Sequence, residues 1–408
     1  MAPRRLLTRL ALAAAATLVV LPLTACEPPA SVTFQGRGWG HGRGMSQWGA
    51  LGYAVDHGWS GTRILDHYYG GTTTRTVTAT DQRVYLTASR GRELVVTQSA
   101  GRLRVDGYGA DVRATRVARL SAGRFRVWRG TGCNGPWTLV GDRSAGEVVV
   151  RSSIAQGDDP TRMLQHCTGS GTRYYRGELR AVEALGTVVT VNKVATELML
   201  RSIVPKEVSP YWADLGGGRG AAAVRAQAVA ARSYAVSGDT RWGSWATTCD
   251  SSQCQVYGGY GTRTASGSTI TKVEDPRTTT AVAATANQVR RRADGRVART
   301  EFGSSSGGWT AGGDFPAVRD EGDDYAGNAN HAWSVTLGRA TIEAAYDRHQ
   351  GRDLGTFQSF DSYARNGLGE LGGRVTRVRA RFSGGDVTLT GEQVRSVLGL
   401  KSNWFATA

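Results

Sequence analysis

One glutamate stands in a sequence context that could support acid catalysis. Glu207 lies between Pro205 and Pro210, in the heptad VPKEVSP at 204–210. Proline fixes its own φ angle and moves the preceding residue away from the helical region, so these prolines predict a stiff bend that positions the carboxylate. A general acid needs such positioning. The alternative is a solvated glutamate in an ordinary loop, because most glutamates lie at the surface.

Polar side chains that could line a binding groove follow Glu207 in three segments. A helix rich in small residues is predicted over 220–236, and the other two segments are QVYGG at 255–259 and the turn SSSGG at 304–308. Residues seven apart in a helix share a face, which brings the two helical candidates together. For the turn, a flexible loop is the alternative. The candidate substrate-binding residues are Gln227, Tyr234, Gln255, Tyr257, Ser304, Ser305 and Ser306.

Other residues compete for a chemical role. Asp250 and Glu301 are the carboxylates that most directly rival Glu207 as the acid. His41 lies in the glycine-rich segment 36–50, GRGWGHGRGMSQWGA, and is either a catalytic or ligand residue or a hydrogen-bonded structural histidine. A glycine loop that leads into a helix can hold phosphate, but the Lys-Ser/Thr ending of a nucleotide-binding loop is missing here.

The first 25 residues have the layout of an export signal. Arg4, Arg5 and Arg9 precede an uncharged apolar run at 10–23, which leads into LTAC at 23–26. We expect Cys26 to be lipidated, as in a bacterial lipoprotein, and the alternative is cleavage after a small residue without lipid. No segment reaches the roughly twenty apolar residues that a membrane span requires. The expected location is therefore extracytoplasmic, anchored to the membrane through lipid only or secreted to the cell wall.

The other cysteines predict two disulfides. The chain has five cysteines, and lipidation of Cys26 leaves an even number, which outside the cell indicates disulfide bonds. Cys249 and Cys254 are close enough in sequence to close a small loop, which leaves Cys133 with Cys167. The alternative is a zinc site, but no histidine lies between or beside Cys249 and Cys254. We expect neither a metal nor a cofactor.

The net charge favours anionic partners outside the cell. The formal charge is +16, and arginine contributes almost all of the positive charge. An exported basic protein meets anionic wall polymers and lipid headgroups before it meets nucleic acid. The arginines are scattered, without the interleaved aromatic residues of a nucleic-acid groove, so no nucleic acid is expected as a partner.

Hydrophobic patterning predicts the elements that position these residues. After a linker at 26–30, a strand is predicted at 31–35, and period-two alternation with glycine-rich turns predicts an antiparallel β module over 76–175. Two strands are predicted within 179–191, a helix over 195–203 that leads to the Glu207 bend, a helix over 277–288 and a strand over 297–302. The expected fold class is α+β, with a mixed core from 31–75 and 176–408 and the β module inserted between them.

Several motifs in one order resemble a known family. These are VPKEV at 204–208, RAQAVAARSY at 225–234, CQVYGG at 254–259, SSSGGWT at 304–310 and RSVLGLKSNWF at 395–405. They are similar to the stage II sporulation protein D family, which includes the amidase-enhancer proteins, over roughly 176–405 plus 34–72. The resemblance implies a peptidoglycan lytic transglycosylase that cleaves glycan strands, with Glu207 as the catalytic acid. The alternative that it implies is a non-catalytic wall-binding protein that stimulates an N-acetylmuramoyl-L-alanine amidase.

The sequence departs from the family pattern in two places. The Gly-His-Gly segment commonly follows the LGLKS segment near the C-terminus of the family, whereas here it opens the mature chain. This order predicts a circular permutation, in which the strand at 32–35 packs beside the segment around Trp404. The resemblance implies a zinc site in some family members, with cysteine and histidine ligands near the Cys-Gln motif, but here Gln253 precedes Cys254, so the metal is not expected.

The implied reaction needs only one carboxylate. Most glycosidases use two carboxylates, one as acid and one as base or nucleophile. In a lytic transglycosylase the C6 hydroxyl of the substrate attacks C1 and forms a 1,6-anhydro sugar. Glu207 would therefore be neutral at rest, a state that partial burial favours because it raises the pKa of a carboxyl group.

Overall fold

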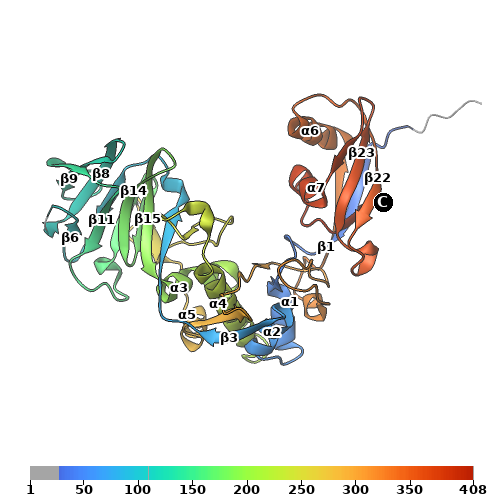
Figure 1. Cartoon of the computed structure of the whole chain (residues 1–408), viewed down its shortest axis with the longest axis horizontal. Coiled ribbons are helices and arrows are strands. Elements are labelled where there is room, and N and C mark those ends of the chain that lie inside the picture. The colour runs from blue at the N-terminus through green and yellow to red at the C-terminus, as the bar shows by residue number, and fades with distance from the viewer. Residues whose placement is uncertain (1–26, 109, 408) are drawn as a thin grey trace, which may run out of the picture.

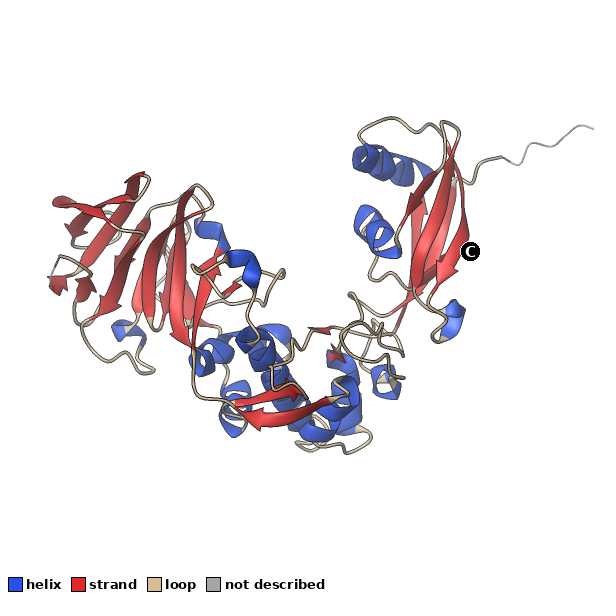
Figure 2. Ribbon diagram, viewed as in Figure 1, coloured by secondary structure: helices blue, strands red, loops and turns tan. Residues whose placement is uncertain are grey.

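The computed structural model describes residues 27–108 and 110–407 and has three parts (Figure 1). A β-rich part lies at one side of the view, a helical part lies at the centre, and a C-terminal part lies at the other side. The expected signal sequence and Cys26 lie outside the described residues. The fold is α+β with mostly antiparallel sheets, as predicted from the sequence. Figure 2 shows strands dominating the β-rich part, helices dominating the central part, and both in the C-terminal part.

Two sheets form the β-rich part. Their strand orders are β10-β9-β8-β5-β12-β13-β17-β18 and β16-β4-β15-β14-β11-β6-β7. Alternating side chains from both sheets, such as Val84, Leu94, Phe125 and Val150, enclose one buried core. The strands are β4 Asp81–Leu86, β5 Leu94–Thr97, β6 Leu103–Val105, β7 Ala110–Val112, β8 Ala114–Ser121, β9 Arg124–Gly130, β10 Thr138–Ser144, β11 Glu147–Ser152, β12 Leu164–Thr168, β13 Gly171–Tyr175, β14 Glu178–Ala184, β15 Thr187–Ala195, β16 Thr248–Cys249, β17 Gly261–Thr264 and β18 Thr271–Lys272.

These sheets extend across the predicted boundary between residues 175 and 176. β14 pairs with β11, β15 pairs with β4, and β17 pairs with β13. Strands from the predicted β module therefore share backbone hydrogen bonds with strands from the predicted core. The division into a module and a core stays a prediction, and strands of both regions share the two sheets.

The helical part is built around one long helix of small residues, α4 (Ala221–Val236). One face of α4, including Val224 and Ala228, belongs to the core of the β-rich part, and another face, including Ala226 and Ala230, belongs to a second core with the N-terminal helices. Small side chains allow this close packing on both sides. The neighbouring elements are α1 Gln47–Val55, α2 Gly61–Tyr68, α3 Thr196–Glu207, α5 Pro276–Ala284, and the strand pairs β2 Met45–Ser46 with β20 Phe302–Gly303 and β3 Thr72–Thr76 with β19 Gln288–Arg292.

The C-terminal part combines both ends of the described chain. The strand β1 (Ser31–Arg37) lies between β21 (Ala332–Gly338) and β25 (Phe405–Thr407). The Arg37 N–H donates to the Trp404 carbonyl at 2.9 Å, so the predicted contact between the first strand and the Trp404 segment is present. A permuted ancestry stays a prediction. The other elements are β22 Phe357–Arg365, β23 Val375–Phe382, β24 Val387–Leu389, α6 Arg339–Gln350 and α7 Gly391–Leu398.

The helix predicted over 195–203 extends four residues further than the sequence indicated, to Glu207. Helix α3 continues through Pro205 and ends at Glu207, and Val208 is the first extended residue. Pro205 removes one hydrogen bond near the end of the helix, a loss that a last turn tolerates because the Val208 N–H still donates to the Val204 carbonyl at 3.0 Å. The residue before Pro210 is extended, as proline requires. The helix end, rather than a loop, therefore positions the carboxylate.

Two other predicted elements are shorter than expected. The helix predicted over 277–288 ends at Ala284 in α5, and the chain continues into β19. The strand predicted over 297–302 is reduced to the two-residue strand β20, which pairs in parallel with β2. Within the described residues, no helix is both long and apolar enough to cross a membrane.

Candidate functional site

The carboxyl group of Glu207 is half-buried at the end of α3. The Val256 N–H donates to its Oε1 at 3.1 Å. Burial raises the pKa of Glu207, and the hydrogen bonds from Val256 and from the Gln47 side chain oppose this rise without cancelling it. No cation forms an ion pair with Glu207 in the described part of the chain. The protonated acid is therefore more populated here than in a solvated glutamate.

Three glutamines from segments far apart in the sequence, Gln47, Gln227 and Gln255, lie near the elements that position Glu207. Gln47, the first residue of α1, donates to Glu207 and also reaches the Gln227 Oε1 at 3.5 Å across 180 residues of sequence. The Gln255 Nε2 donates to the Ala231 carbonyl at 3.1 Å. Gln47 was missed as a site residue by the sequence reasoning, although it belongs to the GHGRGMSQ segment that carries the family resemblance.

Buried hydrogen bonds hold Gln47 in place. Ser46 caps α1 by accepting from the Gly49 N–H at 3.0 Å, and its hydroxyl donates to Asp323 Oδ1 at 2.6 Å. Pairing of β2 with β20 aligns Met45 with Phe302. An N-cap hydrogen bond and a strand pairing together set both the start and the direction of a helix. The N-terminal segment thus reaches Glu207 in a defined orientation.

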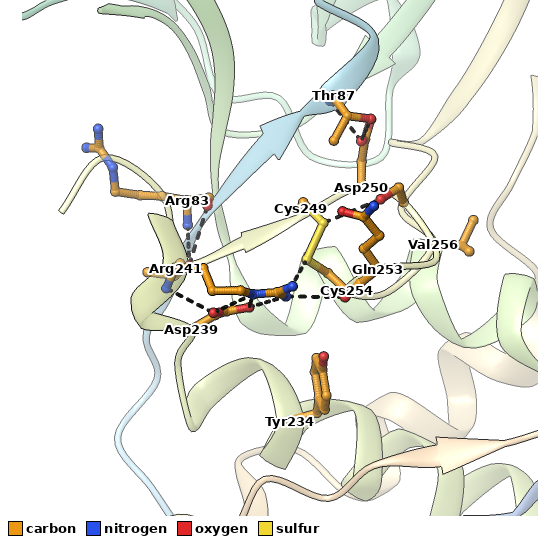
Figure 3. Close-up of a disulfide and its surroundings, with 12 residues drawn as sticks. Arg83, Thr87, Tyr234, Asp239, Arg241, Cys249, Asp250, Gln253, Cys254 and Val256 are labelled. Atoms are coloured by element: carbon orange, nitrogen blue, oxygen red, sulfur yellow. Dashed lines mark hydrogen bonds and ion pairs between the residues drawn. A yellow bond between two sulfur atoms is a disulfide. The ribbon is translucent and has the colours of Figure 1, made fainter. Parts of the chain in front are cut away.

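The disulfide Cys249–Cys254 lies next to the backbone that contacts Glu207 (Figure 3). It closes a loop of five residues' separation, directly before Val256. The Gly258 N–H donates to the Ser202 hydroxyl at 3.0 Å, which ties the same segment to α3. The disulfide therefore restrains the segment whose Val256 N–H donates to the Glu207 carboxylate. The second disulfide joins Cys133 to Cys167.

Aromatic rings follow both Gln47 and Glu207 in the sequence. The ring of Trp48, next to Gln47, lies 4.8 Å from the ring of Trp212 and stacks with Tyr325 at 6.0 Å. Tyr211, four residues after Glu207, is 69% exposed. Exposed aromatic faces with polar edges suit amphipathic ligands such as sugars. The sequence reasoning did not select these rings.

The predicted residues of α4 and the QVYGG segment lie mainly inside the protein. Gln227 and Gln255 are each 1% exposed. The Tyr257 hydroxyl donates to Asn192 Oδ1 at 2.7 Å in the core, and the Tyr234 hydroxyl accepts from Arg299 at 2.6 Å. Their side chains hold the segments around Glu207 together, and their contact with substrate stays a prediction.

The serine turn also makes internal hydrogen bonds. The hydroxyls of Ser305 and Ser306 donate to the buried carboxylates of Asp323 and Asp320 at 2.8 and 2.7 Å. The Ser304 carbonyl accepts from the Trp48 N–H at 3.0 Å. The turn thus anchors α1, and a direct sugar contact of these serines stays a prediction.

The other candidates for a chemical role, Glu301, Asp250 and His41, either form hydrogen bonds within the protein or are neutral. Glu301 forms two hydrogen bonds with Arg43 at 2.7 and 3.0 Å; burial raises its pKa, but Arg43 lowers it more, so the carboxyl group stays ionised. One oxygen of Asp250 accepts from the N–H and hydroxyl of Thr87 at 2.9 and 2.7 Å. Burial, followed by the charge of Arg43, lowers the pKa of His41 to about 4, so its ring is neutral and accepts from the Arg43 N–H at 2.9 Å.

A comparison with protein families matches residues 184–291 to SpoIID, the stage II sporulation protein family. The matched range runs from the end of β14 to β19 and includes Glu207 and α4. No curated protein and no solved structure matches the chain.

Proposed function

We propose that this chain, which carries a stage II sporulation protein domain over residues 184–291, is a peptidoglycan lytic transglycosylase with Glu207 as its acid. One observation carries the proposal: a half-buried glutamate without a cationic partner has a raised pKa and is held by a backbone N–H at a helix end. That is the state a general acid needs near neutral pH.

The reaction uses one carboxyl group twice. Protonated Glu207 donates its proton to the glycosidic oxygen, the bond from C1 to this oxygen breaks, and positive charge develops at C1. The Glu207 carboxylate then accepts the proton of the C6 hydroxyl while O6 bonds to C1. The products are a shortened strand with a free hydroxyl and a 1,6-anhydro muramic end, and Glu207 is protonated again.

The neighbours of Glu207 suit its change of charge. Between the two steps the carboxylate is negative, and the Val256 N–H and the Gln47 amide donate to it. Hydrogen bonds to a charged group are stronger than those to a neutral one, so they favour the ionised intermediate more than the resting acid. The site therefore lowers the barrier to proton release without trapping the ionised state with a salt bridge.

The surroundings disfavour a two-carboxylate hydrolase. Glu301 is paired with Arg43, and Asp250 is hydrogen-bonded to Thr87. A hydrolase of the usual kind needs a second free carboxylate at a defined distance across the sugar. With both rivals engaged elsewhere, attack by the substrate's own hydroxyl is the chemistry that one carboxyl group supports.

The two disulfides support a location outside the cytoplasm, because disulfides persist in oxidising compartments. A lipid on Cys26 would keep the protein at the membrane surface, within reach of the wall. The partners in this proposal are glycan strands, with an amidase as a second partner that removes stem peptides.

The decisive experiment is digestion of peptide-free glycan strands, followed by mass spectrometry of the ends. We expect anhydromuramic ends from the unaltered protein and a loss of about 10²- to 10⁴-fold for Glu207→Gln, the usual contribution of a general acid. Glu301→Gln and Asp250→Asn serve as comparison variants that should keep anhydro product.

Other outcomes separate the alternatives. Full cleavage by Glu207→Gln together with loss in Glu301→Gln or Asp250→Asn would move the acid role to that residue. Reducing ends would indicate hydrolysis by water. No cleavage by the unaltered protein, with stimulation of an added amidase, would indicate the wall-binding enhancer instead.

A further inference from the structure

A cavity of about 470 Å³ lies at one end of the β-rich part. Its walls are the turn after β4, the hairpin between β12 and β13, and Asp250, the first residue within the Cys249–Cys254 loop, and Glu207 does not line it. Its size lies within the usual range of small-ligand sites, about 300 to 1,000 Å³. The cavity is thus separate from the contacts of the proposed acid.

Hydrogen-bond donors gather on one wall of this cavity. The guanidinium of Arg173 lies beside the buried hydroxyl of Tyr175. His166 is 8% exposed, and burial, followed by the charge of Arg173, lowers its pKa to about 4, so its ring is neutral and carries one N–H. Within the described residues the His166 ring makes no hydrogen bond to the protein. Donors of this kind favour an anionic or carbonyl oxygen.

Two arginines, Arg92 and Arg173, line the cavity, and the charge of Asp250 offsets only part of theirs. In the described part of the chain, neither Arg173 nor Arg92 forms an ion pair. Glu93 is held by Arg116 through two hydrogen bonds of 2.6 and 2.7 Å. Asp250 directs one oxygen to Thr87, which leaves its second oxygen as an acceptor. The cavity thus offers a positive group for a carboxylate and an acceptor for an N–H.

Part of the remaining wall is apolar. Leu86, Ala88 and the ring of Tyr175 form this part, and Ser89, Thr168, Gly169 and Ser170 also line the cavity. Such a wall leaves room for methyl-sized side chains beside the polar groups. A ligand with a carboxylate, an N–H and small side chains matches all three features.

We propose that this cavity binds the free carboxylate end of a short peptide with small side chains. Arg173 binds the carboxylate together with the Tyr175 hydroxyl and the His166 N–H, and the free oxygen of Asp250 accepts a peptide N–H. The identification of the peptide as a peptidoglycan stem peptide rests on the proposed function, because such stems are the carboxylate-terminated, alanine-rich peptides that a wall-acting protein meets. The β-rich part would then bind the stem peptide, and Glu207 in the helical part would cleave the glycan strand.

Isothermal titration calorimetry on the purified protein tests the site without any cleavage. The probes are N-acetyl-D-alanyl-D-alanine and its C-terminal amide, which lacks the carboxylate. We expect the acid to bind at least about tenfold more tightly than the amide, because a charge-assisted hydrogen bond to Arg173 is lost in the amide. Equal binding of both probes, or no binding of the acid at millimolar concentration, overturns the proposal.

Variants assign the site within the molecule. Arg173→Gln should weaken binding of the acid to the level of the amide, whereas Arg263→Gln, an arginine on the adjacent strand that does not line the cavity, should bind normally. Arg173→Lys, which keeps the charge, should bind with intermediate affinity and covers the case in which the glutamine variant folds poorly. Unchanged binding by a folded Arg173→Gln protein excludes this site.

The same titration with Glu207→Gln protein separates this inference from the proposed function. Because Glu207 does not line the cavity, that variant should bind the acid peptide as tightly as the unaltered protein. For the unaltered protein, peptide binding without any glycan cleavage would overturn the proposed transglycosylase activity and keep the peptide site. Glycan cleavage without peptide binding would overturn the peptide site and keep the transglycosylase activity.

Discussion

The pKa of a glutamate in this protein depends on whether an arginine lies beside it. Glu207 and Glu301 are both partly buried, and burial raises the pKa of each. Arg43 reverses the effect at Glu301, whereas Glu207 meets only neutral donors. A single ion pair thus separates a permanently ionised carboxylate from one that can hold and release a proton. At the residue scale, this contrast is why the proposal assigns the acid role to Glu207.

The pH dependence of cleavage should report the partners of Glu207. The acid must be protonated to start the reaction, so the rate should fall as the pH rises through its raised pKa. Gln47 lowers this pKa by donating to the carboxylate. We therefore expect Gln47→Leu to move the falling limb of the pH–rate profile to higher pH while it reduces the maximal rate.

Rates of anhydro-product formation between pH 4 and 9 provide the measurement. Gln358→Leu, at an exposed position on β22, is the matched control and should leave the profile in place. A Gln47→Leu profile that superimposes on that of the unaltered protein would show that Gln47 does not touch the reacting carboxyl group.

At the scale of elements, the site depends on how short segments are anchored. Ser46 and Asp323 hold the start of α1, and the disulfide loop holds the Val256 N–H against the end of α3. Each anchor joins segments that are distant in sequence. Weakening an anchor should therefore affect activity more than global stability, because few core contacts are lost.

The two disulfides offer a direct comparison. Loop-closure entropy predicts that removing Cys249–Cys254, with a separation of five residues, costs about 2 kcal/mol, and that removing Cys133–Cys167, with a separation of 34, costs about 4 kcal/mol. We expect the double variant Cys249→Ser/Cys254→Ser to lose more cleavage, and Cys133→Ser/Cys167→Ser to lose more stability. Denaturant unfolding and the glycan assay measure the two effects. A parallel loss of both properties in both variants would show that the small loop has no special role in positioning Val256.

At the scale of the whole molecule, a buried pair of carboxylates joins the N-terminal segment to the serine turn. Asp323 accepts from Ser46, Ser305 and His331, and these hydrogen bonds keep its pKa low despite burial. Burial and the nearby charge of Asp323 raise the pKa of Asp320 to about 7. The folded protein therefore holds a proton on Asp320 that the unfolded chain releases near pH 4.

Stability should consequently fall as the pH rises from about 4 to about 7 because of Asp320, and this contribution should be constant above that range. Asparagine mimics the protonated acid, so Asp320→Asn should gain stability relative to the unaltered protein across this range, by up to the order of 4 kcal/mol. Urea unfolding at pH 4, 6 and 8 measures the difference in free energy of unfolding between Asp320→Asn and the unaltered protein.

The exposed neighbour Asp324 provides the control, because Asp324→Asn should change stability little at any of these values. If the difference in free energy of unfolding between Asp320→Asn and the unaltered protein stays constant with pH, the raised pKa of Asp320 is contradicted.

The sequence predicted secondary-structure elements better than the side-chain contacts between distant segments. Alternation predicted antiparallel strands within 76–175, where β4 to β13 lie, and small residues predicted the helix observed as α4, because these signals come from neighbours in the chain. The same reasoning assigned the serines of 304–306 to the sugar, since a sequence does not reveal that a hydroxyl faces a buried carboxylate. It also missed Gln47, which meets Glu207 only through folding.

The sequence by itself determined the α+β pattern, the cysteines able to pair, the domain matched at 184–291 and the glutamate singled out between two prolines. Only the tertiary structure decided which donors meet that glutamate, that no cation neutralises it, and which rival carboxylates are engaged. The physical reason is that periodicity and backbone preference act over a few residues, whereas burial and Coulomb interaction depend on distances between segments far apart along the chain.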